Sequence, residues 1–380
     1  MHNAKTIETY MACAHDYKDE IFERGLVNVI KKDFELRNIV GDESIKPIWS
    51  GLKVTGLCNF ACEHCWARLA KENRTYKEII AAVDKLHEIG VLHITVSGGE
   101  PFLRDDIKDI LKYIKHKGMH LSVYTNGSLL SKKLIDELET IMDETDVVQI
   151  SLDGANKDTF YKQRKSMLFE KVLENIGFLG SSCITTRVNM VATYINISEI
   201  EAVYKICNKL KVDTFSLSYV YDLNKGKSIY NKDCIDKYLE QVTKCIGLSD
   251  LYQTKFKPFI PIDYYSVQAQ RSIYHDKVKF PSYDLMLYRF INSKGDIYPE
   301  VSLEEPELKM GNIFEDDAEV ILNKSIEIGN KLIMRDLKNT KCASCSMLEN
   351  CRGGDMGRSY RIYKTVDCAD PYCEVLDNNE

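Results

Sequence analysis

Short β-rich runs alternate with longer amphipathic helical patterns from Trp49 onward, and this alternation constrains the fold more than any other feature of the sequence. The first helix begins at Thr75, where Glu78 completes a capping-box pattern, and it ends at Gly90. Strands are predicted at residues 52–57, 92–97, 121–125, 147–152, 184–193 and 214–219. Further helices are predicted at residues 106–117, 132–141, 169–179 and 198–210. Because parallel strands need helical crossovers, six such units predict an α/β fold whose ligands bind at the carboxyl ends of the strands.

The chain divides into four predicted parts. Residues 1–48 are expected to form a helical extension, and residues 49–225 carry the β/α units. Residues 226–282 are expected to form an irregular or helical connector, and residues 283–380 a small cysteine-rich domain with a strand-turn pattern at 293–296.

The charge balance gives no electrostatic basis for a nucleic-acid partner. The chain has 51 basic and 57 acidic residues, interspersed, with a net charge of -6. No segment has the apolar core of a signal peptide or the length of a membrane span, so we expect a cytoplasmic protein with no membrane partner. Thirteen cysteines in a reducing compartment favour metal ligands or redox groups over disulfides.

Three cysteines follow the first predicted strand at spacings of four and three residues. Cys58, Cys62 and Cys65 therefore lie on one loop that wraps a compact object. Three thiolates can hold three irons of a four-iron cluster, which leaves the fourth iron open to an exogenous ligand. The alternatives are a zinc site completed by His64 and an accidental cluster of cysteines.

A glycine-rich motif, Ser97-Gly98-Gly99-Glu100-Pro101, follows the second predicted strand. Paired glycines let the backbone approach a ligand closely, and a carboxylate accepts hydrogen bonds from an ammonium group. Together with the cysteine motif, this pattern resembles the radical SAM superfamily. Matching elements continue at residues 124–127 and 150–154, so the resemblance covers about residues 49–220.

The resemblance implies a partial (β/α)6 barrel in which the methionine part of S-adenosyl-L-methionine binds the open iron of a [4Fe-4S] cluster. Cys58, Cys62 and Cys65 are then the catalytic cluster ligands, and Glu100 holds the amino group. Arg164 has a second interpretation as a solvated charge on a helix face. The cofactor-binding residues implied are His64, Gly98, Gly99, Glu100, Asn126, Ser151, Asp153 and Arg164.

A second cysteine cluster lies near the C-terminus and suits either a structural zinc or an iron-sulfur cluster. Its spacing resembles the SPASM extension that carries auxiliary clusters in radical SAM enzymes. The resemblance implies one auxiliary [4Fe-4S] cluster, with Cys368 as the alternative last ligand. The implied ligands are Cys342, Cys345, Cys351 and Cys373.

Three positions depart from a full SPASM domain. Arg289, Glu300 and Asp355 stand where the resemblance expects further cysteines. Their absence favours the reduced, Twitch-like arrangement with one auxiliary cluster, although retention of a second cluster through Glu300 and Asp355 stays open.

The function implied is that of a radical SAM enzyme, an oxidoreductase-type protein that cleaves the cofactor reductively and abstracts hydrogen from its substrate. A ribosomally made peptide is the leading substrate, with a crosslink, thioether or oxidised side chain as product. Val301 lacks the acid of sulfatase-maturing relatives, which disfavours that activity. A small-molecule dehydrogenase or rearrangement enzyme and a non-catalytic metal-binding protein are the alternatives. The expected electron donor is a flavodoxin or ferredoxin, and whether the cofactor is consumed or regenerated stays open.

Overall fold

The computed structural model describes residues 49–65, 72–219, 232–258, 288–333, 335–345, 348, 353–371 and 373. The helical extension predicted at residues 1–48 lies outside the described residues, as does most of the connector predicted at 226–282.

One sheet organises the described part of the chain, with strand order β10-β9-β8-β1-β2-β3-β4-β5-β6-β7. Neighbours from β1 to β7 are parallel, and β8 pairs in parallel with the free side of β1. The β8–β9 and β9–β10 pairs are antiparallel. The strands are β1 (Trp49–Thr55), β2 (His93–Gly98), β3 (His120–Thr125), β4 (Val147–Ser151), β5 (Thr185–Ala192), β6 (Thr214–Tyr219), β7 (Lys255–Lys257), β8 (Tyr288–Ile291), β9 (Asp296–Tyr298) and β10 (Gly311–Asn312).

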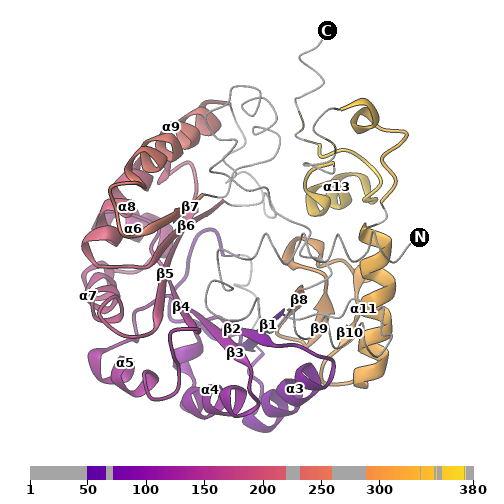
Figure 1. Cartoon of the computed structure of the whole chain (residues 1–380), viewed down its shortest axis with the longest axis horizontal. Coiled ribbons are helices and arrows are strands. Elements are labelled where there is room, and N and C mark those ends of the chain that lie inside the picture. The colour runs from indigo at the N-terminus through magenta and orange to yellow at the C-terminus, as the bar shows by residue number, and fades with distance from the viewer. Residues whose placement is uncertain are drawn as a thin grey trace.

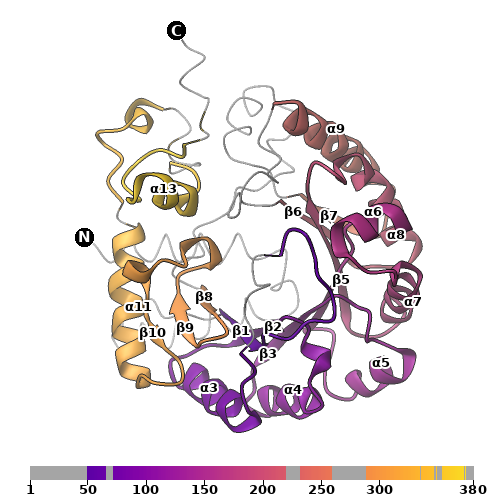
Figure 2. The same cartoon turned by 180° about the vertical axis from the view of Figure 1, so that it is seen from behind.

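Helices cover the outer face of the curved sheet, and the C-terminal helices lie beside its β8–β10 end (Figures 1 and 2). This arrangement confirms the predicted α/β fold with a partial (β/α)6 barrel. The helices are α3 (Tyr76–Glu88), α4 (Ile107–His116), α5 (Lys132–Leu138), α6 (Lys157–Arg164), α7 (Phe169–Leu179), α8 (Ile200–Lys209), α9 (Lys232–Leu248), α11 (Ala318–Ile333) and α13 (Met356–Tyr363).

Alternation along the strands separates an apolar outer face from a polar inner face. Leu52 and Val54 on β1 are fully buried in the main core, while Lys53 between them points to the other face. The predicted capping box is present, since Thr75 accepts from the Glu78 backbone and the Glu78 carboxylate accepts from Thr75 N at 2.8 Å.

Every predicted strand is present within three residues of its expected limits, and the pattern at 293–296 is the turn between β8 and β9. The elements without a predicted counterpart include α6, α11, α13, β7 and β10, while α9 lies within the connector predicted to be irregular or helical. The helix α6 has too few apolar residues to show a helical period, and β7 has only three residues, so neither gives a clear pattern.

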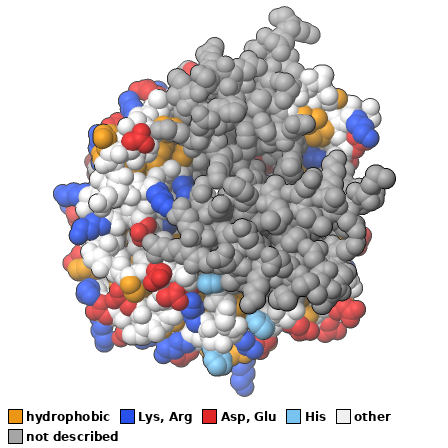
Figure 3. Space-filling model, in the orientation of Figure 1, with side chains coloured by type: hydrophobic (Ala, Val, Ile, Leu, Met, Phe, Trp, Pro, Cys, Tyr) orange, Lys and Arg blue, Asp and Glu red, His pale blue; other side chains and the backbone are white. Residues whose placement is uncertain are grey.

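Charged side chains of both signs are mixed over the visible rim of the molecule (Figure 3). Among the described residues, no helix is both long and apolar enough to cross a membrane.

Candidate functional site

The cysteine loop follows the carboxyl end of β1. Most of the predicted site residues lie at this same edge of the sheet. Cys58 is exposed, Cys62 is buried and Cys65 is half-buried. Phe60 N donates to Cys58 Sγ at 3.4 Å, and Cys65 N donates to Cys62 O at 3.3 Å. Burial raises the pKa of both Cys58 and Cys62, and the neighbouring thiols add to each shift.

The glycine pair packs directly on this loop. Gly99 N donates to Thr55 O and Glu100 N donates to Leu57 O, each at 2.7 Å. A Cβ atom on Gly99 would lie 2.0 Å from Leu57 O, and one on Gly98 would lie 2.2 Å from Thr55 O. The close backbone approach that the glycines permit is therefore made to the chain's own cysteine loop.

Glu100 is fully buried and anchors the next loop of the sheet edge. Its carboxylate accepts from Thr125 Oγ1 at 2.7 Å, from Asn126 N at 2.7 Å and from Phe102 N at 3.2 Å. Burial raises the pKa of Glu100, and these donors oppose that shift. A carboxylate has about four acceptor positions, so one position remains for a further donor.

Asn126 joins the β3 loop to the cysteine loop. Its Nδ2 donates to Asn59 Oδ1 at 2.8 Å, while its Oδ1 accepts from Ser128 Oγ at 2.6 Å. Asn59 Nδ2 in turn donates to Ser128 Oγ at 3.0 Å. Since Asn59 follows Cys58 directly, this network fixes the start of the cysteine loop.

Arg164 and Asp153 form a buried ion pair beside the second cysteine. Arg164 Nε lies 2.5 Å from Asp153 Oδ2, and Arg164 Nη1 lies 3.6 Å from Cys62 Sγ. His64 Nε2 lies 3.5 Å from the same Asp153 oxygen. Arg164 is 7% exposed, so its interpretation as a solvated charge on a helix face is wrong. Ser151 precedes Asp153 by two residues in the sequence. It is the last residue of β4 and is half-buried.

The helix α6 holds the cysteine loop, a role that the sequence analysis missed. Glu63 N donates to Gln163 O at 2.9 Å, and Lys165 Nζ lies 2.9 Å from Glu63 Oε1. The available signal was Asn156, whose side-chain oxygen accepts from the backbone amides of Asp158 and Thr159, both at 3.0 Å, in the first turn of α6.

The C-terminal cysteines lie in a second, smaller cluster of contacts, and Cys351 lies outside the described residues. Cys342 is buried with Leu337 and Ala369, and Cys345 N donates to Cys342 O at 3.0 Å. Lys341 Nζ donates to Cys373 O, and this contact places Cys373 beside the segment that begins with Lys341 and Cys342. Cys368 instead directs its thiol to Thr365 O at 3.4 Å.

Glu300 and Asp355, two of the three positions where the SPASM resemblance expects cysteines, lie near each other. Burial raises the pKa of Glu300 to about 7, and the charge of Asp355 adds to the shift. Asp355 also caps α13 by accepting from Arg358 N at 2.7 Å. Arg289, the third position, is fully buried and donates from Nη2 to Ser325 O at 3.3 Å.

The residues fit an iron-sulfur cluster and its cofactor by their donor chemistry. Three thiols lie on one loop, and that loop is held by α6 on one side and by the glycine pair on the other. Within the described ranges, no three Cys, His, Asp or Glu side chains converge closely enough to ligate a metal ion as the side chains stand. Ligation therefore requires the thiols to turn toward a common centre.

Comparison with known proteins gives one family and several relatives. Residues 52–207 match the Radical SAM superfamily. The chain is 27% identical over 350 residues to the antilisterial bacteriocin subtilosin biosynthesis protein AlbA of Bacillus subtilis, with 86% of this chain and 74% of AlbA covered. It is 24% identical over 337 residues to the AdoMet-dependent heme synthase of Methanosarcina barkeri, with 84% and 94% covered.

A solved structure shares the fold. Streptococcus suis SuiB bound to its precursor peptide SuiA superposes with a TM-score of 0.70 at 19% identity, covering 92% of this chain and 80% of SuiB. At this identity the likeness supports the architecture and no more.

Proposed function

Because residues 52–207 of this chain belong to the Radical SAM superfamily, we propose that the protein cleaves S-adenosyl-L-methionine reductively and modifies a ribosomally made peptide. The observation that carries the proposal is the cysteine loop, which the glycine pair and α6 hold at the carboxyl edge of a parallel sheet. The product is a crosslink, a thioether or an oxidised side chain.

When bound, the reduced [4Fe-4S] cluster and S-adenosyl-L-methionine supply the 5'-deoxyadenosyl radical that abstracts hydrogen from the substrate. The thiolates of Cys58, Cys62 and Cys65 hold that cluster. Glu100 accepts the cofactor's ammonium at its remaining acceptor position, beside the donors that already orient its carboxylate.

The remaining cofactor contacts come from the loops after β2, β3 and β4 and from α6. Asp153 fixes Arg164 and faces His64, so the three side chains are oriented as one unit. The proposed contact residues are His64, Gly98, Gly99, Asn126, Ser151, Asp153 and Arg164.

The C-terminal domain holds one auxiliary [4Fe-4S] cluster on Cys342, Cys345, Cys351 and Cys373. The contact between Lys341 and Cys373 supports Cys373 as the last ligand, because Lys341 precedes Cys342 directly. A reducing compartment such as the cytoplasm keeps these thiols available, and a flavodoxin or ferredoxin supplies the electron.

A peptide substrate is supported by AlbA, whose name describes bacteriocin biosynthesis, and by SuiB, solved with its precursor peptide. A small-molecule substrate is the second candidate. The match to the heme synthase of Methanosarcina barkeri, which spans 94% of that enzyme, favours a cofactor precursor within this class.

Anaerobic reconstitution tests the chemistry. The parent protein, mixed with S-adenosyl-L-methionine and dithionite, is expected to form 5'-deoxyadenosine, and a triple alanine variant of Cys58, Cys62 and Cys65 is expected to form none. Cys183→Ala is the matched control, because Cys183 is exposed and lies in neither cysteine motif. A fully active triple variant, or an inactive parent with a full and reducible cluster, would contradict the proposal.

The same assay separates the two substrate classes. A short peptide encoded beside the gene is expected to stimulate 5'-deoxyadenosine formation and to change in mass. Stimulation by a tetrapyrrole precursor, with no effect of the peptide, would favour the second candidate.

A further inference from the structure

Arg187 is a buried arginine on the inner face of β5. Its neighbours on the strand, Val188 and Met190, are fully buried in the main core. Because side chains alternate along a strand, Arg187 points to the opposite, inner face of the curved sheet. The residue is only 7% exposed. Arginine is almost never buried to this extent unless its charge is paired, so this position requires a physical explanation.

The guanidinium of Arg187 lacks the compensation that other buried arginines receive. Arg164 forms an ion pair with Asp153, and Arg358 forms one with Asp370. None of the ion pairs found among the described residues includes Arg187, and its Nε is buried with no hydrogen-bond partner. A buried cation without a partner lowers the stability of the folded chain. The requirements of folding therefore do not explain an arginine here.

The register of the sheet places Arg187 in a polar layer of the inner face. Arg187 pairs with Gln149 on β4 and with Thr214 on β6. The next inward-facing residue of β5 is Asn189, whose Oδ1 accepts from Ser216 Oγ at 3.0 Å. These neighbours offer amide and hydroxyl groups to a polar ligand, and none of them carries a negative charge.

The same register places Arg187 close to the proposed cofactor site. Asn189 pairs with Ser151, which is the last residue of β4 and one of the proposed cofactor contacts. Arg187 precedes Asn189 by two residues, so it lies about 7 Å from that level of the sheet along β5. A group bound to Arg187 therefore lies inside the barrel, on the side of the cofactor contacts that faces the amino ends of the strands.

We propose that Arg187 binds a carboxylate of the substrate in the interior of the barrel. The planar guanidinium can donate two parallel hydrogen bonds to one carboxylate, and the bound anion compensates the buried charge. The carboxylate belongs to an acidic residue of a peptide substrate or to an acidic side chain of a tetrapyrrole precursor. The inference rests on the proposed function, because it assigns the carboxylate to the molecule that the cofactor radical attacks.

A titration with small probes measures this binding on the reconstituted full chain in the presence of S-adenosyl-L-methionine. The acidic probe is N-acetyl-glutamate N-methylamide, and the glutamine analogue is its neutral isostere. In saturation-transfer NMR, the parent is expected to bind the acidic probe about tenfold more tightly than the neutral one. Arg187→Met is expected to abolish this preference, and Arg187→Lys to keep part of it, because lysine retains the charge without the fork.

Porphobilinogen, a pyrrole that carries two carboxylates, distinguishes the two sources. Tighter binding of porphobilinogen than of the acidic peptide probe, lost in Arg187→Met, would assign the site to a tetrapyrrole precursor. Equal binding of the acidic and neutral probes by the parent, together with no binding of porphobilinogen, overturns the inference. An acidic preference that persists in Arg187→Met also overturns it.

Thermal unfolding supplies a second, independent measurement. Arg187→Met is expected to melt at the same temperature as the parent or higher, because it removes an uncompensated buried charge. The acidic probe is expected to raise the melting temperature of the parent and not that of the variant. A variant that melts well below the parent, or does not fold, would show that the chain itself compensates Arg187, and this overturns the inference.

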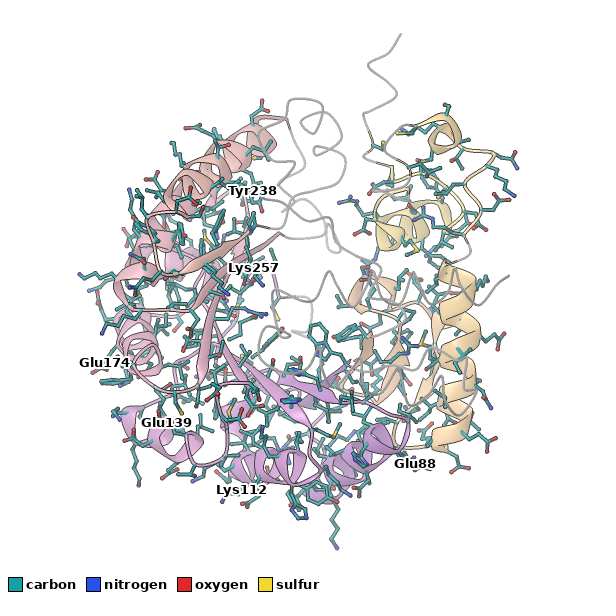
Figure 4. The ribbon with its side chains drawn as sticks, viewed as in Figure 1. Glu88, Lys112, Glu139, Glu174, Tyr238 and Lys257 are labelled. Carbon is teal, nitrogen blue, oxygen red and sulfur yellow. The ribbon has the colours of Figure 1, made fainter. Side chains whose placement is uncertain are left out.

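Lys112→Met is the matched control, because it removes a positive charge from an exposed lysine of α4 on the outer rim (Figure 4). This variant is expected to bind both peptide probes as the parent does, and a loss of the acidic preference here would overturn the assignment to Arg187. The probe titration requires no turnover. Failure of the proposed function is therefore seen separately, as a parent protein that forms no 5'-deoxyadenosine.

Discussion

At the scale of single residues, the inner face of the sheet buries a histidine as well as a lysine. His93 is fully buried at the start of β2, where its Nε2 lies 2.9 Å from Ser122 Oγ and its ring meets Trp49 edge-on. Burial lowers the pKa of His93 to about 3, and the charges of His120, Arg187 and Lys115 add to the shift. The folded protein therefore keeps this imidazole neutral well into the acid range.

Because the pKa of His93 is lower in the folded state than in the unfolded state, its stabilising contribution is complete above pH 6.5 and is lost as the pH falls toward 3. We expect the parent to lose about 1.4 kcal/mol per pH unit relative to His93→Gln below pH 6.5. Thermal unfolding followed by circular dichroism at pH 7, 6 and 5 measures this difference. His116→Gln, at an exposed position on α4, should show no such trend. A constant difference between parent and His93→Gln would refute the assignment.

At the scale of elements, the junction between β2 and the following 3-10 helix (Pro101–Leu103) is fixed by contact with the loop after β1. Gly99 has no room for a side chain there, since Leu57 O would lie 2.0 Å from its Cβ. The constraint is steric and comes from backbone, which cannot rotate away as a flexible side chain can.

We therefore expect Gly99→Ala to displace the backbone before Cys58, to destabilise the protein by about 1–3 kcal/mol and to reduce the iron and sulfide bound per chain. Gly177→Ala is the matched control. Gly177 lies within α7, and a Cβ atom there would make an ordinary contact with the Leu210 side chain at 3.6 Å. That control is expected to be neutral or stabilising by about 0.5–1 kcal/mol, as for alanine in a helix interior. Equal iron content in both variants would argue against a positioning role for Gly99.

Strands β1 to β6, the helices α3, α4, α5, α7 and α8, and the Thr75 cap were predictable from sequence, because each has a local apolar period or a capping residue. The parallel pairing of β8 with β1 was not, since it joins segments far apart in sequence and no local pattern encodes it. The burial of Arg164 and Lys53 was missed for a related reason. Asp153 follows β4 and meets Arg164 only in the folded chain, and Glu304, whose charge acts on Lys53, lies far from it in the sequence.

At the scale of the whole molecule, the C-terminal hairpin is docked on the barrel by more than strand pairing. Arg74 donates from Nη2 to Lys294 O at 2.9 Å and from Nε to Ser293 O at 3.4 Å. Its guanidinium also lies 4.4 Å from the centroid of the Phe314 ring. The β8–β9 hairpin, which leads to Glu300, is thus held against Arg74 in the segment that follows the cysteine loop.

Metal content distinguishes one auxiliary cluster from two. We expect about eight irons per reconstituted chain, four for each of two clusters, and about four after double substitution of Cys342 and Cys345 by alanine. Glu300→Ala should leave the count unchanged, because only thiols are proposed as ligands. About twelve irons in the parent, with a loss of about four in Glu300→Ala, would show that Glu300 helps to hold a second auxiliary cluster.

The pairing of β8 with β1 also has a consequence for synthesis of the chain. Ser50 Oγ donates to Arg289 O at 3.2 Å across 239 residues of sequence. At ribosomal rates of about 5–20 residues per second, roughly 12–48 seconds separate the emergence of these two partners. During that interval β1 has an open edge, the kind of surface at which nascent chains associate wrongly. The cysteine loop thus leaves the ribosome long before the strand that carries it has both of its neighbours.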